Sequence, residues 1–194
     1  MEMMTRILRT TALAILLILP MHNIADAEMV VAHKNVRLVH YNVREFFEGY
    51  IFFVRKFNMP ETWIPQWESM QETILHRIYR FKTDEGVRMG FWETYDNEIS
   101  QIEIEGSTVE YISRYTAFIL LLLNVDEDEI KDLFATMKAN ENPSTEVIGN
   151  DVEAIGKGCV YSKVEQKYVH VNMYVIKKDM TDQIKFVIYA TVAK

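Results

Sequence analysis

The chain has 194 residues, of which 28 are acidic and 21 are basic, so its formal net charge is −7 at pH 7. This acidic balance argues against nucleic acid or an anionic lipid surface as the partner. Aromatic residues make up 12% of the chain, which is typical of a packed globular domain and excludes the class of disordered chains.

The N-terminal stretch has the pattern of a secretory signal peptide. Arg6 and Arg9 are positive, Ala12–Leu19 is apolar, and Ala25-Asp26-Ala27 is a cleavage site of the A-x-A type. We therefore predict that residues 1–27 are removed and that residues 28–194 form a single globular α+β domain. No cysteine lies close after the apolar segment to accept a lipid, so we expect no stable membrane anchor after cleavage.

The cysteine and glycosylation patterns bear on localisation. Cys159 is the single cysteine, so no intramolecular disulfide can form. No glycosylation sequon exists, because Pro143 interrupts Asn142-Pro143-Ser144. Both features favour bacterial export, and we predict a periplasmic or secreted protein.

Two helices are predicted at the start of the mature chain. Apolar residues recur at three- and four-residue steps over Asn35–Asn58, and again from Pro65 to about Lys82. These segments are expected to form an antiparallel helical hairpin. Gly49 lies inside the first helix, where it is predicted to mark a close packing contact.

A hairpin of strands is predicted next. After the turn Asp84-Glu85-Gly86, apolar residues alternate over Val87–Tyr95. Asp96-Asn97 reads as the hairpin turn, and Ile102–Glu105 is the return strand. We expect Glu103 and Glu105 to lie on a solvated face, with paired carboxylates as the alternative.

Ser107–Asn124 is predicted to form the central helix of the core. Ser107 and Glu110 have the spacing of a capping box. From Thr116 to Leu123 the sequence is apolar on every face, but a membrane span needs about 20 residues. The stretch is therefore expected to be buried on all sides. A fourth helix is predicted to follow from Asp126, with Asp126 and Glu129 as its capping signature, to about Asn140.

The remaining chain is predicted to be a polar loop over Glu141–Asp151 followed by strands. One strand precedes a turn at Glu165-Gln166, a second follows it, and a third covers Gln183–Ala193. The order is ααββααβββ, which indicates an α+β fold with one antiparallel sheet of about five strands and about four helices.

The C-terminal hairpin supplies the candidates for catalysis. A turn at Glu165-Gln166 would place Cys159 opposite Asn172, with His170 as the diagonal neighbour of Cys159. A thiol, an imidazole and an amide are the parts of a cysteine nucleophile site, and Gly156 and Gly158 could offer backbone N–H groups to an oxyanion. A small buried cysteine on a structural sheet is the alternative interpretation.

Metal and cofactor sites are not predicted. The histidines after the cleavage site are His33, His40, His76 and His170, and none has metal-ligand spacing. The acidic run Asp126–Glu129 lacks the alternating ligands and the glycine of a calcium loop. No phosphate-binding, dinucleotide-binding or serine-nucleophile motif occurs.

Surplus aromatic residues give the leading hypothesis for function. Beyond a core role, they could line an apolar pocket or groove, with the candidate ligand-binding residues Phe46, Tyr50, Phe53, Trp63 and Trp67. We therefore expect a non-enzymatic binding module for an apolar ligand or a protein partner. The alternatives are a cysteine-dependent hydrolase or transferase using Cys159 and His170, and a structural or oligomeric interaction subunit.

Overall fold

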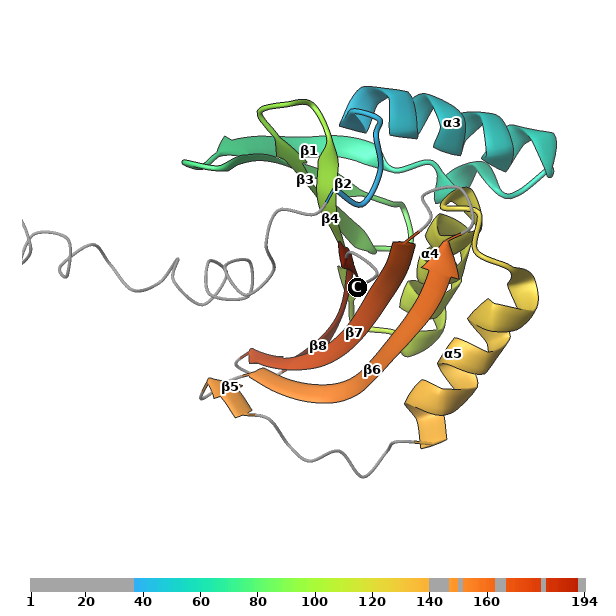
Figure 1. Ribbon diagram of the computed structural model, residues 1–194, viewed down its shortest axis with the longest axis vertical. Helices are drawn as coiled ribbons and strands as arrows, with labels where there is room; N and C mark the ends of the chain where they lie inside the picture. The colour runs from blue at the N-terminus through green and yellow to red at the C-terminus, as the bar shows by residue number, and fades with distance from the viewer. Residues whose placement is uncertain (1–36, 140–146, 150–151, 163–166, 179–180, 192–194) are drawn as a thin grey trace, which may run out of the picture. The chain divides into compact units, whose positions relative to one another are not determined.

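A single antiparallel sheet carries the fold (Figure 1). The computed structural model describes residues 37–139, 147–149, 152–162, 167–178 and 181–191. All of them belong to one compact unit, Asn35–Lys194. The predicted signal peptide and its cleavage site lie outside the described residues.

The sheet has seven long strands and one three-residue strand among the described residues. Its strand order is β1-β2-β3-β4-β8-β7-β6-β5, and every neighbouring pair is antiparallel. The strands are β1 (Gln66–Glu72), β2 (His76–Lys82), β3 (Arg88–Thr94), β4 (Ile99–Gly106), β5 (Val147–Gly149), β6 (Val152–Ser162), β7 (Lys167–Lys178) and β8 (Thr181–Thr191).

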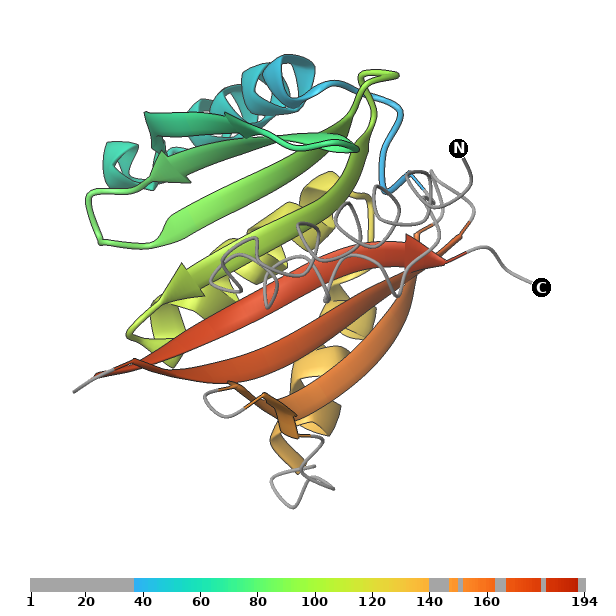
Figure 2. The ribbon, with the colours of Figure 1, turned by 90° about the vertical axis from the view of Figure 1, so that its left-hand side faces the viewer.

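The helices pack on one face of this sheet, which we call the helix face. Figure 2 shows them behind the strands. They are α3 (Val43–Lys56), α4 (Val109–Leu122) and α5 (Glu127–Ala139), together with the short 3₁₀ helix η2 (Glu61–Trp63). The helix face of the strands supplies most of the sheet's share of the core, namely Met89, Phe91, Ile102, Ile104, Val160, Val169, Val171, Phe186, Ile188 and Ala190.

The predicted fold class is confirmed at the level of an α+β fold with a single antiparallel sheet. The predicted strands at Val87–Tyr95 and Ile102–Glu105 correspond to β3 and β4, and the two predicted central helices correspond to α4 and α5. The predicted numbers of strands and helices are wrong. A short strand, β5, also lies inside the predicted loop Glu141–Asp151.

The predicted second helix, from Pro65 to Lys82, is wrong, because this segment forms the β1–β2 hairpin. Thr73 breaks the segment, since its backbone N–H donates to the carbonyl oxygen of His76 at 2.8 Å. Ile74, predicted to lie on an inner helix face, sits at the tip with 94% of its surface exposed. The helical spacing of apolar residues here was overridden by pairing with β3.

The first helix is shorter than predicted, because the chain enters it through an extended segment. Leu38 and Val39 are buried, and their backbone N–H groups donate to the carbonyl oxygen of Ile99. The helix begins after Asn42, whose side chain accepts from the N–H of Glu45 while Glu45 reaches back to the N–H of Asn42. This capping box fixes the start of α3.

The central helix is less enclosed than predicted. Leu120 is fully buried, but Leu121 is 47% exposed, so one face of the apolar stretch meets solvent. The predicted Ser107 cap is also wrong, because Thr108 is the N-cap residue and makes no side-chain capping bond. Gly49 marks no packing contact, since a Cβ there would meet nothing within 4 Å.

Candidate functional site

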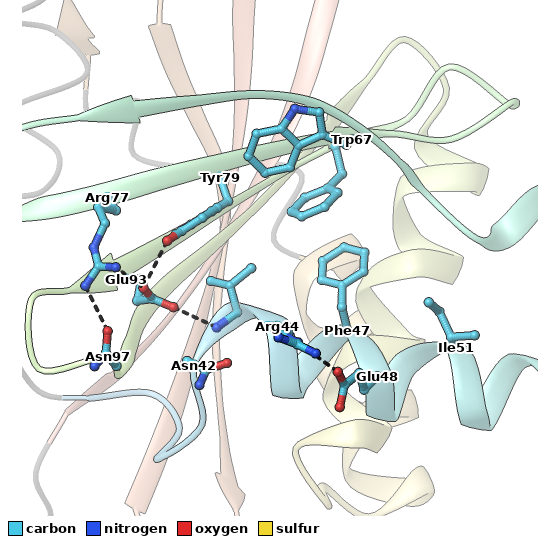
Figure 3. A pocket seen from close by; sticks show the side chains of 12 residues that line it. Asn42, Arg44, Phe47, Glu48, Ile51, Trp67, Arg77, Tyr79, Glu93 and Asn97 are labelled. Atoms are coloured by element: carbon cyan, nitrogen blue, oxygen red, sulfur yellow. Dashed lines mark hydrogen bonds and ion pairs between the residues drawn. The ribbon is translucent and has the colours of Figure 1, made fainter.

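A groove of about 570 Å³ lies between α3 and strands β1–β3 on the helix face (Figure 3). One wall comes from α3 and the other from the strands. It is lined by Asn42, Val43, Arg44, Phe47, Glu48, Ile51, Trp67, Arg77, Tyr79, Phe81, Glu93 and Asn97. Its size is within the range of pockets that hold small ligands.

Aromatic rings form the apolar part of the groove. Phe47 of α3 stacks on Phe81 of β2 with ring centroids 3.9 Å apart, which joins the helix to the sheet. The ring of Trp67 in β1 makes T-shaped contacts with Tyr79 and Phe81, with ring centroids 6.1 and 5.6 Å apart. Trp67 is nevertheless 58% exposed, so the indole presents a large apolar surface that the described side chains leave uncovered.

A buried carboxylate closes the polar end of the groove. Glu93 is only 3% exposed, and its carboxylate accepts from the backbone N–H of Val43 at 2.8 Å and from the hydroxyl of Tyr79 at 3.2 Å. Arg77 forms an ion pair with Glu93 at 3.3 Å and donates to Asn97 at 2.8 Å. Because Val43 is the first residue of α3, the negative charge also stabilises the helix N-terminus.

This network defines the chemistry available at the polar end. Burial raises the pKa of the Tyr79 hydroxyl, and the negative charge of Glu93 raises it further. The oxygens of Glu93 are already engaged by the helix, Tyr79 and Arg77, so its role is to anchor α3 on the sheet. The rim is completed by Arg44 and Glu48, a solvent-exposed pair at 3.0 Å that contributes little to stability.

Of the five predicted ligand-binding residues, Trp67 alone lines this groove. Phe46, Tyr50 and Trp63 are buried in the core, where the hydroxyl of Tyr50 donates to the carbonyl oxygen of Trp63 at 3.0 Å. Phe53 stacks on Phe57 near the end of α3. The groove residues Arg77, Tyr79 and Phe81 on β2 were not predicted, because the apolar spacing there indicates a helix. Glu93 on β3 was not predicted, because a single acidic residue in a strand gives no signal.

The candidate catalytic residues lie on the opposite face of the sheet. In the structure Cys159 pairs with His170 and Tyr161 with Tyr168, so the predicted register is wrong by two residues. The last described pair is Ser162 with Lys167, whereas a turn at Glu165-Gln166 would have paired Lys167 with Val164. A shift of two residues preserves the faces, so the side chains still share one side.

The register brings the thiol and the imidazole into contact. Sγ of Cys159 lies 3.9 Å from Nε2 of His170, and the same nitrogen lies 2.7 Å from the hydroxyl oxygen of Thr191. Asn172 is turned elsewhere, because its Nδ2 donates to the hydroxyls of Tyr174 and Tyr189 at 2.9 and 3.4 Å. The predicted trio is therefore divided into a Cys–His contact and a separate amide–tyrosine cluster.

The electrostatics around Cys159 do not favour a thiolate. Partial burial raises the pKa of the Cys159 thiol, whereas a catalytic cysteine needs a lowered value. Gly158 lies against α5, because a Cβ there would lie 1.9 Å from Cδ1 of Leu133, whereas a Cβ on Gly156 would lie 3.4 Å from Met137, close to an ordinary contact. The raised pKa of the Cys159 thiol therefore gives no support to the predicted cysteine nucleophile.

The remaining acidic residues and histidines considered as candidate sites do not form a site of their own among the described residues. Glu103 is buried and forms an ion pair with Lys185 at 2.8 Å, so the prediction of a solvated face is wrong for this residue. His76 is buried against Trp92, His40 is exposed, and His33 lies outside the described residues. Among the described residues, no group of three His, Cys, Asp or Glu side chains could hold a metal ion.

Neither the search for membrane-spanning helices nor the comparisons with other proteins add a constraint on the site. In the described part of the chain, no helix is long and apolar enough to cross a membrane. Searches against protein-family models, curated proteins and solved structures found no match to this chain.

Proposed function

We propose that this protein is an exported, non-enzymatic binding module that holds an apolar ligand in the groove between α3 and β1–β3. The observation that carries the proposal is the exposed indole of Trp67 on the wall of an aromatic groove. Because 58% of the Trp67 surface is exposed, a ligand that covers the indole would recover part of the about 1.5–3 kcal/mol that full burial of a large apolar side chain contributes.

The form of the groove supports this class of ligand. Phe47, Phe81 and Tyr79 hold the wall in place through ring contacts, so the site is formed before a ligand arrives. Arg77 and Glu93 form an ion pair at one end of the groove, and Arg44 and Glu48 form another at its rim. A ligand with an apolar body and a small polar or anionic end matches this arrangement.

An apolar fluorescent dye of the anilinonaphthalene sulfonate type tests the proposal. The native protein should enhance the dye's fluorescence, and Ile51→Asp should weaken dye binding by about tenfold because it places a charge in the groove. Phe52→Asp is the matched control, since Phe52 is the next residue on the same helix, is exposed, and does not line the groove.

A second groove variant separates ligand binding from loss of folding. Trp67→Ala removes an exposed side chain from β1 and should leave the melting temperature nearly unchanged while weakening dye binding. Absence of dye binding to the native protein would contradict the proposal. Equal weakening by Ile51→Asp and Phe52→Asp would contradict it as well.

A further inference from the structure

Strand β1 ends the sheet next to the groove. It is first in the strand order, and in the described part of the chain it pairs with β2 alone. All seven of its residues, Gln66–Glu72, are exposed. An edge strand of this kind presents backbone N–H and C=O groups that a further strand can use.

The turn at Thr73 determines which backbone groups face outward. The N–H of Thr73 bonds to the carbonyl oxygen of His76, so these two residues form a hydrogen-bonded pair. Pairs alternate along an antiparallel ladder, which makes Glu72 and Met70 members of non-hydrogen-bonded pairs with Arg77 and Tyr79. The backbone N–H and C=O of Met70 and Glu72 therefore point away from β2.

The outward-facing stretch is continuous with the groove. Met70 is opposite Tyr79, which lines the groove, so the side chain of Met70 lies on the helix face. A strand added antiparallel to β1 would place the residues opposite Met70 and Glu72 on that same face, beside Trp67. The bulge at Glu68 ends the regular stretch, which leaves Ser69–Glu72 as the pairing segment.

The acidic residues of β1 indicate which kind of segment can pair with this edge. Strand β1 contains Glu68 and Glu72 and no basic residue. Glu68 pairs with Arg88 at 3.2 Å, but Glu72 has no ion-pair partner among the described residues. A second copy of this chain would bring another acidic edge against the first, whereas a segment with a basic residue would complement Glu72.

We infer that β1 takes up an extended segment of a partner protein, in which apolar residues alternate with polar ones and a basic residue lies opposite Glu72. The backbone of the segment extends the sheet, and its apolar side chains reach the groove beside Trp67. The inference rests on the proposed function, because it names a polypeptide as the occupant of the same groove.

A synthetic peptide, acetyl-Thr-Lys-Thr-Leu-Thr-Val-Thr-amide, tests the inference by calorimetric titration. Its Val, Leu and Lys side chains share one face when the peptide is extended. In an antiparallel complex the lysine lies opposite Glu72 and the leucine opposite Met70. The backbone N–H groups of these two peptide residues then bond to the carbonyl oxygens of Glu72 and Met70, so methylating those two nitrogens should weaken binding by at least about tenfold. Methylating the threonine nitrogens, which point away from β1, should change the affinity by less than about threefold.

A charge variant of β1 provides a second test of the inference. Glu72→Lys should weaken binding of the unmodified peptide by about threefold to tenfold. Glu127→Lys on α5 makes the same change in net charge on an exposed residue away from β1 and should have no effect. Equal affinities of the two methylated peptides would overturn the strand pairing.

The remaining outcomes distinguish this inference from the proposed function. If the peptide does not bind while the dye still does, the inference is overturned and the groove keeps its proposed role. If neither binds, the proposed function fails with it. A dimer in light scattering that Met70→Asp dissociates would also overturn the inference, because a second copy would then occupy the edge.

Discussion

At the scale of single residues, Glu93 links the sequence to the geometry of the groove. Its carboxylate joins the first turn of α3 to Tyr79 and Arg77 of β2, so one side chain fixes the helix against the strands. No pattern in the sequence pointed to this role, because Glu93 is one acidic residue in a strand and its partner Val43 contributes only a backbone N–H.

The thiol of Cys159 gives a prediction at the same scale. Because burial raises its pKa, the rate of alkylation by iodoacetamide should keep rising with pH above the ordinary range of a cysteine. The same cysteine in urea should reach its plateau at lower pH. A native plateau below about pH 7.5 would contradict this and would favour the cysteine-dependent enzyme.

At the scale of elements, α4 shows where periodicity succeeds and where it stops. The run Thr116–Leu123 indicated a core helix, and Leu120 is fully buried. The apolar sequence could not show that Leu121 faces solvent, because that depends on which sides the sheet and α5 cover. An all-apolar segment specifies burial in general but not the side that is left open.

Two matched substitutions on α4 test this arrangement. Leu120→Ala should lower the free energy of unfolding by about 2–5 kcal/mol, because it removes a fully buried side chain. Leu121→Ala should cost less than about 1 kcal/mol. Urea denaturation measures both, and equal losses would mean that α4 is packed differently.

In the β1–β2 hairpin, by contrast with α4, periodicity predicts the wrong element. Trp67, Met70, Ile74, Ile78 and Phe81 are spaced as on one helix face, so periodicity alone predicts a helix. In the fold Phe81 stacks on Phe47, while Ile78 lies on the opposite face of the sheet. Pairing between segments distant in sequence decided the structure, and a single sequence carries little information on such pairing.

At the scale of the whole molecule, the fold class was predictable but most of the site was not. The candidate groove needs α3 to lie over β1–β3, and two of those strands come from the segment that was expected to be helical. Aromatic content alone predicted that Trp67 lines an apolar pocket or groove, but it could not place that groove between α3 and β1–β3. The predicted proximity of Cys159 and His170 is unaffected by the error in register, because a change of two residues leaves both side chains on the same face.

The central claim is that the groove between α3 and β1–β3 is the binding site. The most direct test is a two-dimensional NMR titration of residues 28–194, the predicted mature chain, with the apolar dye. The account predicts that amide resonances of groove residues such as Ile51, Trp67 and Tyr79 shift first. Shifts confined to β6–β8 around Cys159 and His170, or no shifts at saturating dye, would contradict it.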